Sequence, residues 1–228
     1  MTAVHPDARR PPLTVYTLAL NYLPLVQLLT GAGLVATLTT SAGALILASL
    51  AWIYLVPPLI CRLALTVFGS PQGRALTQHD RAYKVWWFTY QWQVPFNRLP
   101  WIEEILRLTP GLYVLWLRLW GGRVSLLSFW APGALVIDRP LIVVEAGAVI
   151  GVGAGLSGHS GTLAPDGTYR IDIGTARVGR GAIMGVRSGL AAGELASGQM
   201  LPAGRMIKPF TCWDGKTKRA LDAGGDHG

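Results

Sequence analysis

Apolar residues recur at intervals of six along the second half of the chain. The blocks begin at Val144, Ile150, Leu156, Val178 and Met184, with a weaker block at Leu190. In the five stronger blocks the second residue is usually small and the fifth is Ala or Ser. A period of six is neither the 3.6 of an α-helix nor the 2 of a half-buried strand. It predicts a coil of short parallel strands around a narrow apolar prism, which needs about three stacked turns to close its core.

The coil is expected to occupy residues 122–208, after a Gly–Gly hinge. Its first strands are predicted to begin at Val124, Leu126, Ile137 and Leu141. Residues 138–140 shift the phase of the repeat by one residue, as a bulge or a tight corner would. Pro209 is predicted to close the coil, and residues 209–228 form a C-terminal tail, which is predicted to be disordered from Asp214 to Gly228. A linker rich in Gly and Ala is the alternative, but it would not keep the aliphatic residues in register.

The first third of the chain is apolar in a different way. Residues 13–61 contain no Asp, Glu, Lys, Arg or His, a run far longer than the roughly 20 residues that cross a bilayer. Two transmembrane helices fit, at residues 13–38 and 44–68, in a membrane domain of residues 13–70 with a turn at 39–41. The prolines inside these segments would kink the helices but do not rule out a transmembrane position, because neighbouring groups can satisfy the freed carbonyls. A cleaved signal peptide is the alternative for the first, but the segment is long and lacks a clear cleavage site.

Basic residues flank this helical hairpin at the ends opposite its turn. They are Arg9 and Arg10 before it and Arg62, Arg74, Arg81 and Lys84 after it. Arg and Lys near membrane ends tend to stay cytoplasmic, so we expect a multi-pass protein of the inner (cytoplasmic) membrane. Its N-terminal tail, residues 1–12, and its coil would both be cytoplasmic. The net charge of +8 then indicates attraction to membrane lipid head groups. Nucleic-acid binding is not expected, because the basic residues are scattered.

Tryptophan and tyrosine are crowded among basic residues in the next stretch, residues 71–121. Such rings favour the bilayer interface, and residues 101–108 and 112–120 are predicted to be helices that lie in the cytoplasmic leaflet. Two alternatives stay open. Residues 112–120 could instead pack under the coil, or the region could hold a third crossing, although charged residues interrupt it at short intervals.

Candidate chemistry is sparse in this chain. Cys61 lies in a predicted crossing and Cys212 in the tail, so neither a structural disulfide nor a metal site is indicated. The repeat is interrupted between Gly161 and Ile173 by a stretch with a turn signature at residues 165–167. A loop thrown out from a regular coil is the natural place for a site.

His159 stands just before this interruption. The repeat places it on the outside of the coil, where its side chain would contribute little to packing. The titration range of histidine suits a general base that takes a proton from an attacking hydroxyl or amine. Backbone amides at the glycine-rich corners could stabilise the oxyanion that results. A plain surface histidine is the competing interpretation.

The run LIVVEAGAVIGVGAGLSGH, a loop and then IDIGTARVGRGAIMGVRSG resembles the left-handed β-helix of the hexapeptide acyltransferase superfamily. In that family a His just before an excursion loop is the catalytic base, and His159 falls on that position. The apolar crossings and the Trp-rich segment further resemble the membrane-embedded C-terminal domains of poly-lysine-synthetase-like nonribosomal peptide synthetases. Glu145 and Ser157 depart from the family by standing where Gly is commoner, and no nucleotide-binding motif is visible.

The resemblance implies an acyl-CoA donor and a trimer with sites between neighbouring coils. Phosphate recognition by outward basic residues is assigned to four positions: Arg177, Arg180, Arg187 and Lys208. If about ten residues are extra to an 18-residue coil, Arg187 lies one coil from His159 on the same face. If only about four are extra, Gly181 takes that place. Solvated surface charge is the alternative role for all four.

Three functions follow from these patterns. The first is a membrane-bound acyltransferase that moves an acyl group from a thioester donor to a hydroxyl or amine, with His159 as general base. The second is a peptide-bond-forming partner of a nonribosomal peptide synthetase or carrier protein, whose thioester would replace acyl-CoA. The third is a β-helix scaffold without catalysis. No tightly bound cofactor is expected in any of them.

Overall fold

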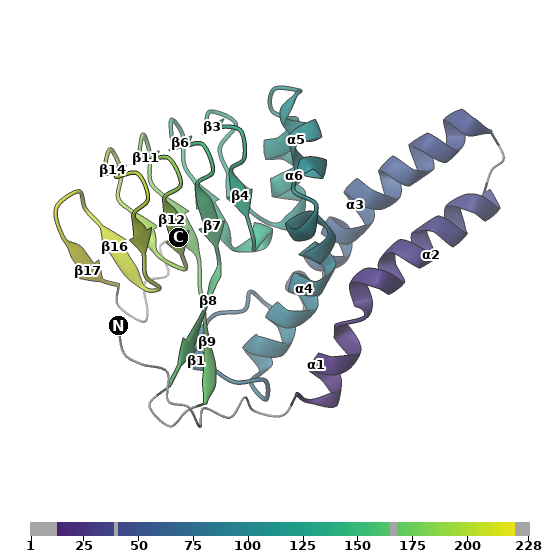
Figure 1. Ribbon diagram of the computed structural model, residues 1–228, viewed down its shortest axis with the longest axis horizontal. Coiled ribbons are helices and arrows are strands. Elements are labelled where there is room, and N and C mark those ends of the chain that lie inside the picture. The colour runs from purple at the N-terminus through teal and green to yellow at the C-terminus, as the bar shows by residue number, and fades with distance from the viewer. Residues whose placement is uncertain (1–12, 39–40, 165–167, 222–228) are drawn as a thin grey trace.

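The computed structural model describes residues 13–38, 41–164 and 168–221. A helical part and a coil of strands lie side by side (Figure 1). The helical part begins with α1 (Val15–Leu20), α2 (Leu23–Leu38) and α3 (Ala42–Phe68). Figure 1 shows α2 and α3 as an antiparallel pair that extends away from the coil. The turn predicted between them falls at residues 39–40, which lie outside the described residues.

Two helical segments, Val15–Leu38 and Ala42–Phe68, are long and apolar enough to cross a membrane. Large apolar side chains along both are exposed, for example Leu29 at 63% and Leu47 at 70%. Pro24 breaks the first apolar segment as expected, because α1 ends at Leu20, the residue whose carbonyl a proline at position 24 would clash with, and α2 begins at Leu23. Pro57 and Pro58 are inside α3, which continues through them.

Three further helices connect the hairpin to the coil: α4 (Arg81–Arg98), α5 (Trp101–Arg107) and α6 (Leu112–Trp120). The α5 and α6 helices were predicted, whereas α4 was not. Leu117 and Trp120 of α6 are fully buried against the first turn of the coil, so this helix packs under the coil, and its position relative to the membrane stays a prediction. The interfacial position predicted for the rings is wrong for Trp86, Trp116 and Trp120, which are at most 4% exposed within the protein.

The coil consists of parallel strands in three sheets, as the six-residue repeat predicts. The first sheet holds β2 (Arg123–Val124), β5 (Ile142–Val144), β10 (Ala176–Val178), β13 (Glu194–Leu195) and β16 (Thr211–Trp213). The second holds β3 (Phe129–Trp130), β6 (Val149–Ile150), β11 (Ile183–Met184) and β14 (Met200–Leu201). The third holds β4 (Leu135–Val136), β7 (Gly155–Ser157), β12 (Gly189–Ala191) and β15 (Met206–Ile207). Each complete turn of the chain adds one strand to every sheet, and β16 begins a further turn in the first sheet alone. The left-handed sense of the coil stays a prediction.

The predicted register of the core is confirmed. All six block-opening residues are at most 1% exposed: Val144, Ile150, Leu156, Val178, Met184 and Leu190. The small residues at the fifth position of four blocks, Ala148, Ala154, Ala182 and Ser188, are buried beside them, whereas Ser160, fifth in the block from Leu156, is only half-buried and belongs to a strand that leaves the coil. A side chain any larger than Ala or Ser would not fit between the three walls of so narrow a prism.

The two ends of the coil differ from the prediction. Residues 138–140 do form a corner, in which the 3-10 helix η1 (Arg139–Leu141) leads into β5. The coil does not close at Pro209, because β16 pairs with β13 and then turns back into β17 (Lys218–Ala220). Cys212 and Trp213 are buried, and the indole Nε1 of Trp213 donates to the carbonyl of Met200 at 3.0 Å. The disorder predicted from Asp214 onward is wrong for Lys218–Ala220, which form β17, because polar composition does not show backbone pairing with the last strand of the coil; residues 222–228 lie outside the described residues.

The register can be tested by placing a carboxylate inside and outside the prism. Ile150→Asp or Val178→Asp buries an unpaired charge, which is severely unfavourable, so we expect loss of folded, extractable protein. Val152, which is 51% exposed, is the matched control, and Val152→Asp is expected to unfold within a few degrees of the parent. The measurement is thermal unfolding of the detergent-extracted protein. Equal tolerance of all three variants would contradict the register.

Candidate functional site

A β-hairpin interrupts the coil where the sequence predicts a loop. Its strands, β8 (His159–Leu163) and β9 (Tyr169–Ile173), are antiparallel, and β1 (Gly73–Leu76) pairs with the far edge of β9. The hydrogen bond from Gly174 N to Gly158 O, 2.8 Å, closes the base of the hairpin. The turn predicted at residues 165–167 lies outside the described residues.

The hairpin is longer than either of the two insertions, about ten or about four residues, that were expected from the sequence. Ile142 pairs with Ala176, 34 residues later, whereas Arg177 pairs with Glu194, 17 residues later. The excursion therefore adds 17 residues to one turn of the coil, not about ten or four. Neither Arg187 nor Gly181 takes the position one coil from His159, since both lie at corners next to β11, in another wall of the prism.

Helix α4 covers the hairpin from outside the coil (Figure 1). Ile171 and Ile173 of β9 are buried in a cluster with Tyr83 and Trp86 of α4 and with Leu141 of the η1 corner. This packing fixes the hairpin on the helical part of the molecule. It also brings the first residue of β8, His159, against the aromatic face of α4.

His159 is half-buried rather than freely exposed. Its ring centroid lies 4.7 Å from that of Trp86 and 5.4 Å from that of Tyr90, the latter in an edge-on arrangement. The side chain retains 22% of its exposure. The expectation that His159 contributes little to packing is therefore wrong, because the repeat cannot reveal a helix that packs on its outer face.

Asp138 lies beneath the imidazole and is 1% exposed. Its Oδ2 is 2.6 Å from His159 Nδ1 and accepts hydrogen bonds from Gly158 N at 2.8 Å and Ser157 Oγ at 3.1 Å. Its Oδ1 accepts from the indole Nε1 of Trp86 at 2.9 Å. Three N–H groups thus converge on one carboxylate, and the single hydroxyl proton of Ser157 is shared with the carbonyl of His159 at 2.9 Å; such donors are the usual condition for keeping a buried carboxylate ionised.

Burial by itself would raise the pKa of Asp138, but the neighbouring His159 and the hydrogen bonds from His159, Trp86 and Gly158 outweigh it and hold the pKa below its ordinary value. Burial, followed by the charge of Asp138, raises the pKa of Tyr90, so this phenol stays neutral. An ionised Asp138 accepts the proton on Nδ1 and thereby leaves Nε2 of a neutral His159 as an acceptor. Among the described residues Nε2 has no protein partner.

Arg139 fixes the corner that carries Asp138. Its backbone N–H donates to Gln93 Oε1 at 2.7 Å, and its guanidinium donates to Asn97 Oδ1 at 2.9 Å and forms an ion pair with Glu103. These partners lie on α4 and α5. The helical part of the molecule therefore positions both the carboxylate and, through Trp86, the ring of His159.

Sequence reasoning found His159 but not the residues around it. Asp138 entered only as part of a change of phase, although two adjacent charged residues inside an apolar repeat are themselves a signal for a buried polar site. Trp86 and Tyr90 were assigned to a membrane interface. No signal in the hexapeptide pattern could have joined them to His159, because they belong to a helix outside the repeat.

The four basic residues predicted to bind phosphate do not form one site. Arg177, on β10, is ion-paired with Glu145, and Arg180 lines a hollow at the base of the coil. Arg187 occupies a corner with φ 53°, where its backbone N–H donates to Val152 O at 2.9 Å, and Lys208 is exposed just after β15. A role in phosphate binding stays a prediction for each of them. Within the described residues, no three His, Cys, Asp or Glu side chains are placed to hold a metal.

The lowered pKa of Asp138 makes the stability of the site depend on pH. Between the folded pKa and the unfolded value of about 3.9, the unfolded chain binds more protons than the folded one. The ionised Asp138 therefore contributes its full stabilisation of the folded state above the unfolded pKa. This contribution is lost as the pH falls through the lower pKa of the folded state. We expect the difference in melting temperature between parent and Asp138→Asn to be largest at pH 5 to 7 and to shrink below about pH 4. A constant difference across this range would contradict the assignment.

Comparisons with known proteins give no family. No protein-family model matches the sequence, and no curated protein matches it. Among solved structures, serine acetyltransferase isoform 3 of Entamoeba histolytica in complex with cysteine is similar at 11% identity, with 91% of this chain and 80% of that chain covered and a TM-score of 0.19. Serine acetyltransferase of Neisseria gonorrhoeae matches at 11% identity, 92% and 80% coverage and a TM-score of 0.21. Serine acetyltransferase 1 of Entamoeba histolytica in complex with L-cysteine matches at 10% identity, with 88% of each chain covered and a TM-score of 0.23. Similarity this weak carries no argument about activity, so any function has to be argued from the chain's own residues.

Proposed function

We propose that the protein is an acyltransferase in which His159 is the general base. The observation that carries the proposal is the contact between the buried carboxylate of Asp138 and Nδ1 of His159, 2.6 Å, which leaves Nε2 as the proton acceptor. Trp86 and Tyr90 hold the imidazole ring on two sides. Asp138 also fastens α4 and the hairpin through Trp86 and Gly158, and it is the contact with Nδ1, which leaves Nε2 without a protein partner among the described residues, that favours catalysis over the scaffold alternative.

The chemistry proceeds in two stages. The hydroxyl or amine of the acceptor attacks the carbonyl of a thioester donor while Nε2 of His159 takes its proton, and a tetrahedral oxyanion forms. The oxyanion then collapses, the bond from carbon to sulfur breaks, and the departing thiolate takes the proton from the imidazolium. Asp138 stays ionised throughout, and it stabilises the imidazolium and holds the ring in one tautomer.

The donor in this proposal is acyl-CoA or a thioester on a carrier protein, and the acceptor lies at or in the membrane. Both donors release a thiol, and an amine acceptor makes the same step a peptide-bond synthesis with a synthetase partner. The two apolar helices support membrane attachment. The proposed topology keeps the coil in the cytoplasm, where these donors are found, and residues 39–41 on the opposite side of the inner membrane.

The activity of a His159 variant distinguishes the enzyme hypothesis from the scaffold hypothesis. Because the ring packs against α4, His159→Gln, which keeps a planar polar side chain, is preferred to His159→Ala. Loss of the base is expected to lower kcat by roughly 10² to 10⁴ with little change in KM. Thiol release from candidate thioesters in the presence of amine and hydroxyl acceptors gives the measurement. Asp138→Asn is also expected to lower kcat with KM nearly unchanged, because Asp138 orients the ring of His159.

The matched control is His79→Ala, since His79 is an exposed histidine on the loop before α4, and parental turnover is expected. Melting temperatures of all variants separate loss of catalysis from loss of fold. A His159→Gln protein that is folded and as active as an active parent would remove the catalytic proposal and leave the scaffold.

Topology can be measured by cysteine labelling, because both natural cysteines, Cys61 and Cys212, are buried. A membrane-impermeant maleimide is expected to label Ser41→Cys from outside intact spheroplasts and to label Lys208→Cys only after permeabilisation. Labelling of Ser41→Cys only after permeabilisation would place the turn in the cytoplasm and overturn the hairpin.

A further inference from the structure

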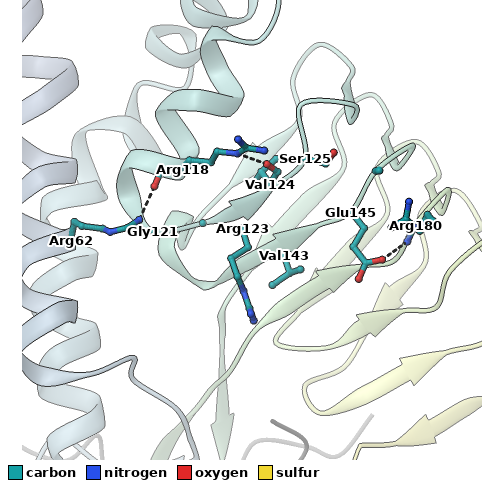
Figure 2. Close-up of a pocket in the computed structure, with 11 residues that line it drawn as sticks. Arg62, Arg118, Gly121, Arg123, Val124, Ser125, Val143, Glu145 and Arg180 are labelled. Carbon is teal, nitrogen blue, oxygen red and sulfur yellow. Dashed lines mark hydrogen bonds between the residues drawn. The ribbon is translucent and has the colours of Figure 1, made fainter. Parts of the chain in front are cut away.

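A hollow of about 700 Å³ lies where the end of α3, the end of α6 and the first sheet of the coil meet. Four arginines line it: Arg62, Arg118, Arg123 and Arg180. Figure 2 shows their side chains around one region, with Glu145 the single acidic residue among those labelled. The arginines come from α3, from α6, from β2 and from the corner after β10, so the fold gathers them from separate parts of the sequence.

The protein itself neutralises little of this charge. Arg62 and Arg118 each direct one donor at a backbone carbonyl, Arg118 O at 2.9 Å and Val124 O at 2.6 Å. Among the described residues no side chain pairs with the guanidinium groups of Arg123 and Arg180, which are exposed. Glu145 is already engaged by Arg177 and by the backbone N–H of Arg180. The hollow is therefore cationic and retains free donors for an anion.

An apolar groove of about 480 Å³ runs between the same two helices. Leu50 and Leu55 of α3 face Leu112, Leu115 and Leu119 of α6 across it. Leu55 and Leu115 remain 47% and 53% exposed, and exposed leucine side chains are stabilised by contact with hydrocarbon rather than with water. The groove is the right kind of surface for a hydrocarbon chain.

The groove and the arginine hollow follow one another along the helices. Arg62 comes seven residues, or two turns, after Leu55 on the same face of α3, which is a rise of about 10 Å. Arg118 comes one turn after Leu115 on α6. The two helices stay together over this length, because Trp116 Nε1 donates to Tyr54 O at 2.9 Å and Arg62 donates to Arg118 O.

We propose that this surface binds one anionic lipid, with its head group in the arginine hollow and an acyl chain in the groove of α3 and α6. The order of the two parts matches a membrane lipid. The groove lies along the apolar middle of α3, and Arg62 is the first charged residue after it, six residues before the end of this helix at Phe68, from where its long side chain can reach the head-group layer. A soluble phosphate compound would use the hollow but would have no use for the groove.

The proposal is tested on the full chain in detergent by native mass spectrometry, with phosphatidylglycerol and phosphatidylcholine as probes. The parent is expected to bind phosphatidylglycerol at least about tenfold more tightly, because each basic residue near an anionic lipid contributes roughly a five- to tenfold gain. Arg123→Gln with Arg180→Gln is expected to remove most of this preference without loss of fold, since neither side chain has a structural partner. Leu115→Trp, which fills the groove, is expected to weaken binding of both lipids.

The charge-matched control is Arg98→Gln with Arg219→Gln, two exposed arginines that do not line the hollow, and it is expected to keep the preference. Inorganic pyrophosphate serves as the soluble competitor. An equal affinity for both lipids, or an equal loss in the control variant, would overturn the proposal. Pyrophosphate binding that depends on Arg123 and Arg180, with no lipid preference, would replace it with a site for a soluble phosphate. None of these outcomes depends on turnover, so the lipid site and the catalytic proposal can fail separately.

Discussion

Two adjacent buried charges, Asp138 and Arg139, are the constraint on which the rest of the structure depends. Both are 1% exposed, and a buried charge is tolerated only with partners that satisfy it. The side chain of Asp138 is held by Trp86 and by the base of the hairpin, and that of Arg139 by Asn97 and Glu103. The coil supplies only part of these groups. This corner can therefore form at full stability only when α4 and α5 are docked on it.

The docking has a second, apolar component. One cluster of buried residues runs from Cys61 of α3 through Phe96, Trp116 and Trp120 to the interior of the coil and on to Trp213. The ring centroids of Phe96 and Trp116 are 5.0 Å apart, and α6 covers the first turn of the prism in the way that Trp213 covers its last. A coil with an open end would expose its apolar interior to water, so the helices act as its cap as well as its attachment.

This arrangement explains why the candidate active site and the candidate lipid site lie on different parts of the same junction. The hairpin that carries His159 emerges from one corner of the coil and is covered by α4. The arginine hollow lies instead at the base of the first sheet, where α3 and α6 end. In both places residues of the coil and of the helical part line the same site, and neither part contains the complete site.

The sequence by itself determined the elements whose cause is local. A six-residue period can only bury its aliphatic positions in a stacked coil, so Ile150 and Val178 could be assigned to the core, and a charge-free run predicted the two long apolar helices. His159 could be singled out because it borders the interruption of the repeat. Only the tertiary structure decided that Asp138, 21 residues earlier, reaches His159, that Trp86 and Tyr90 cover it, and that the tail continues the coil. The contacts of Asp138, Trp86 and Tyr90 with His159 depend on which outer face of the coil α4 packs against. The repeat predicts which side chains point into the prism, but it carries no information on what packs against the outside.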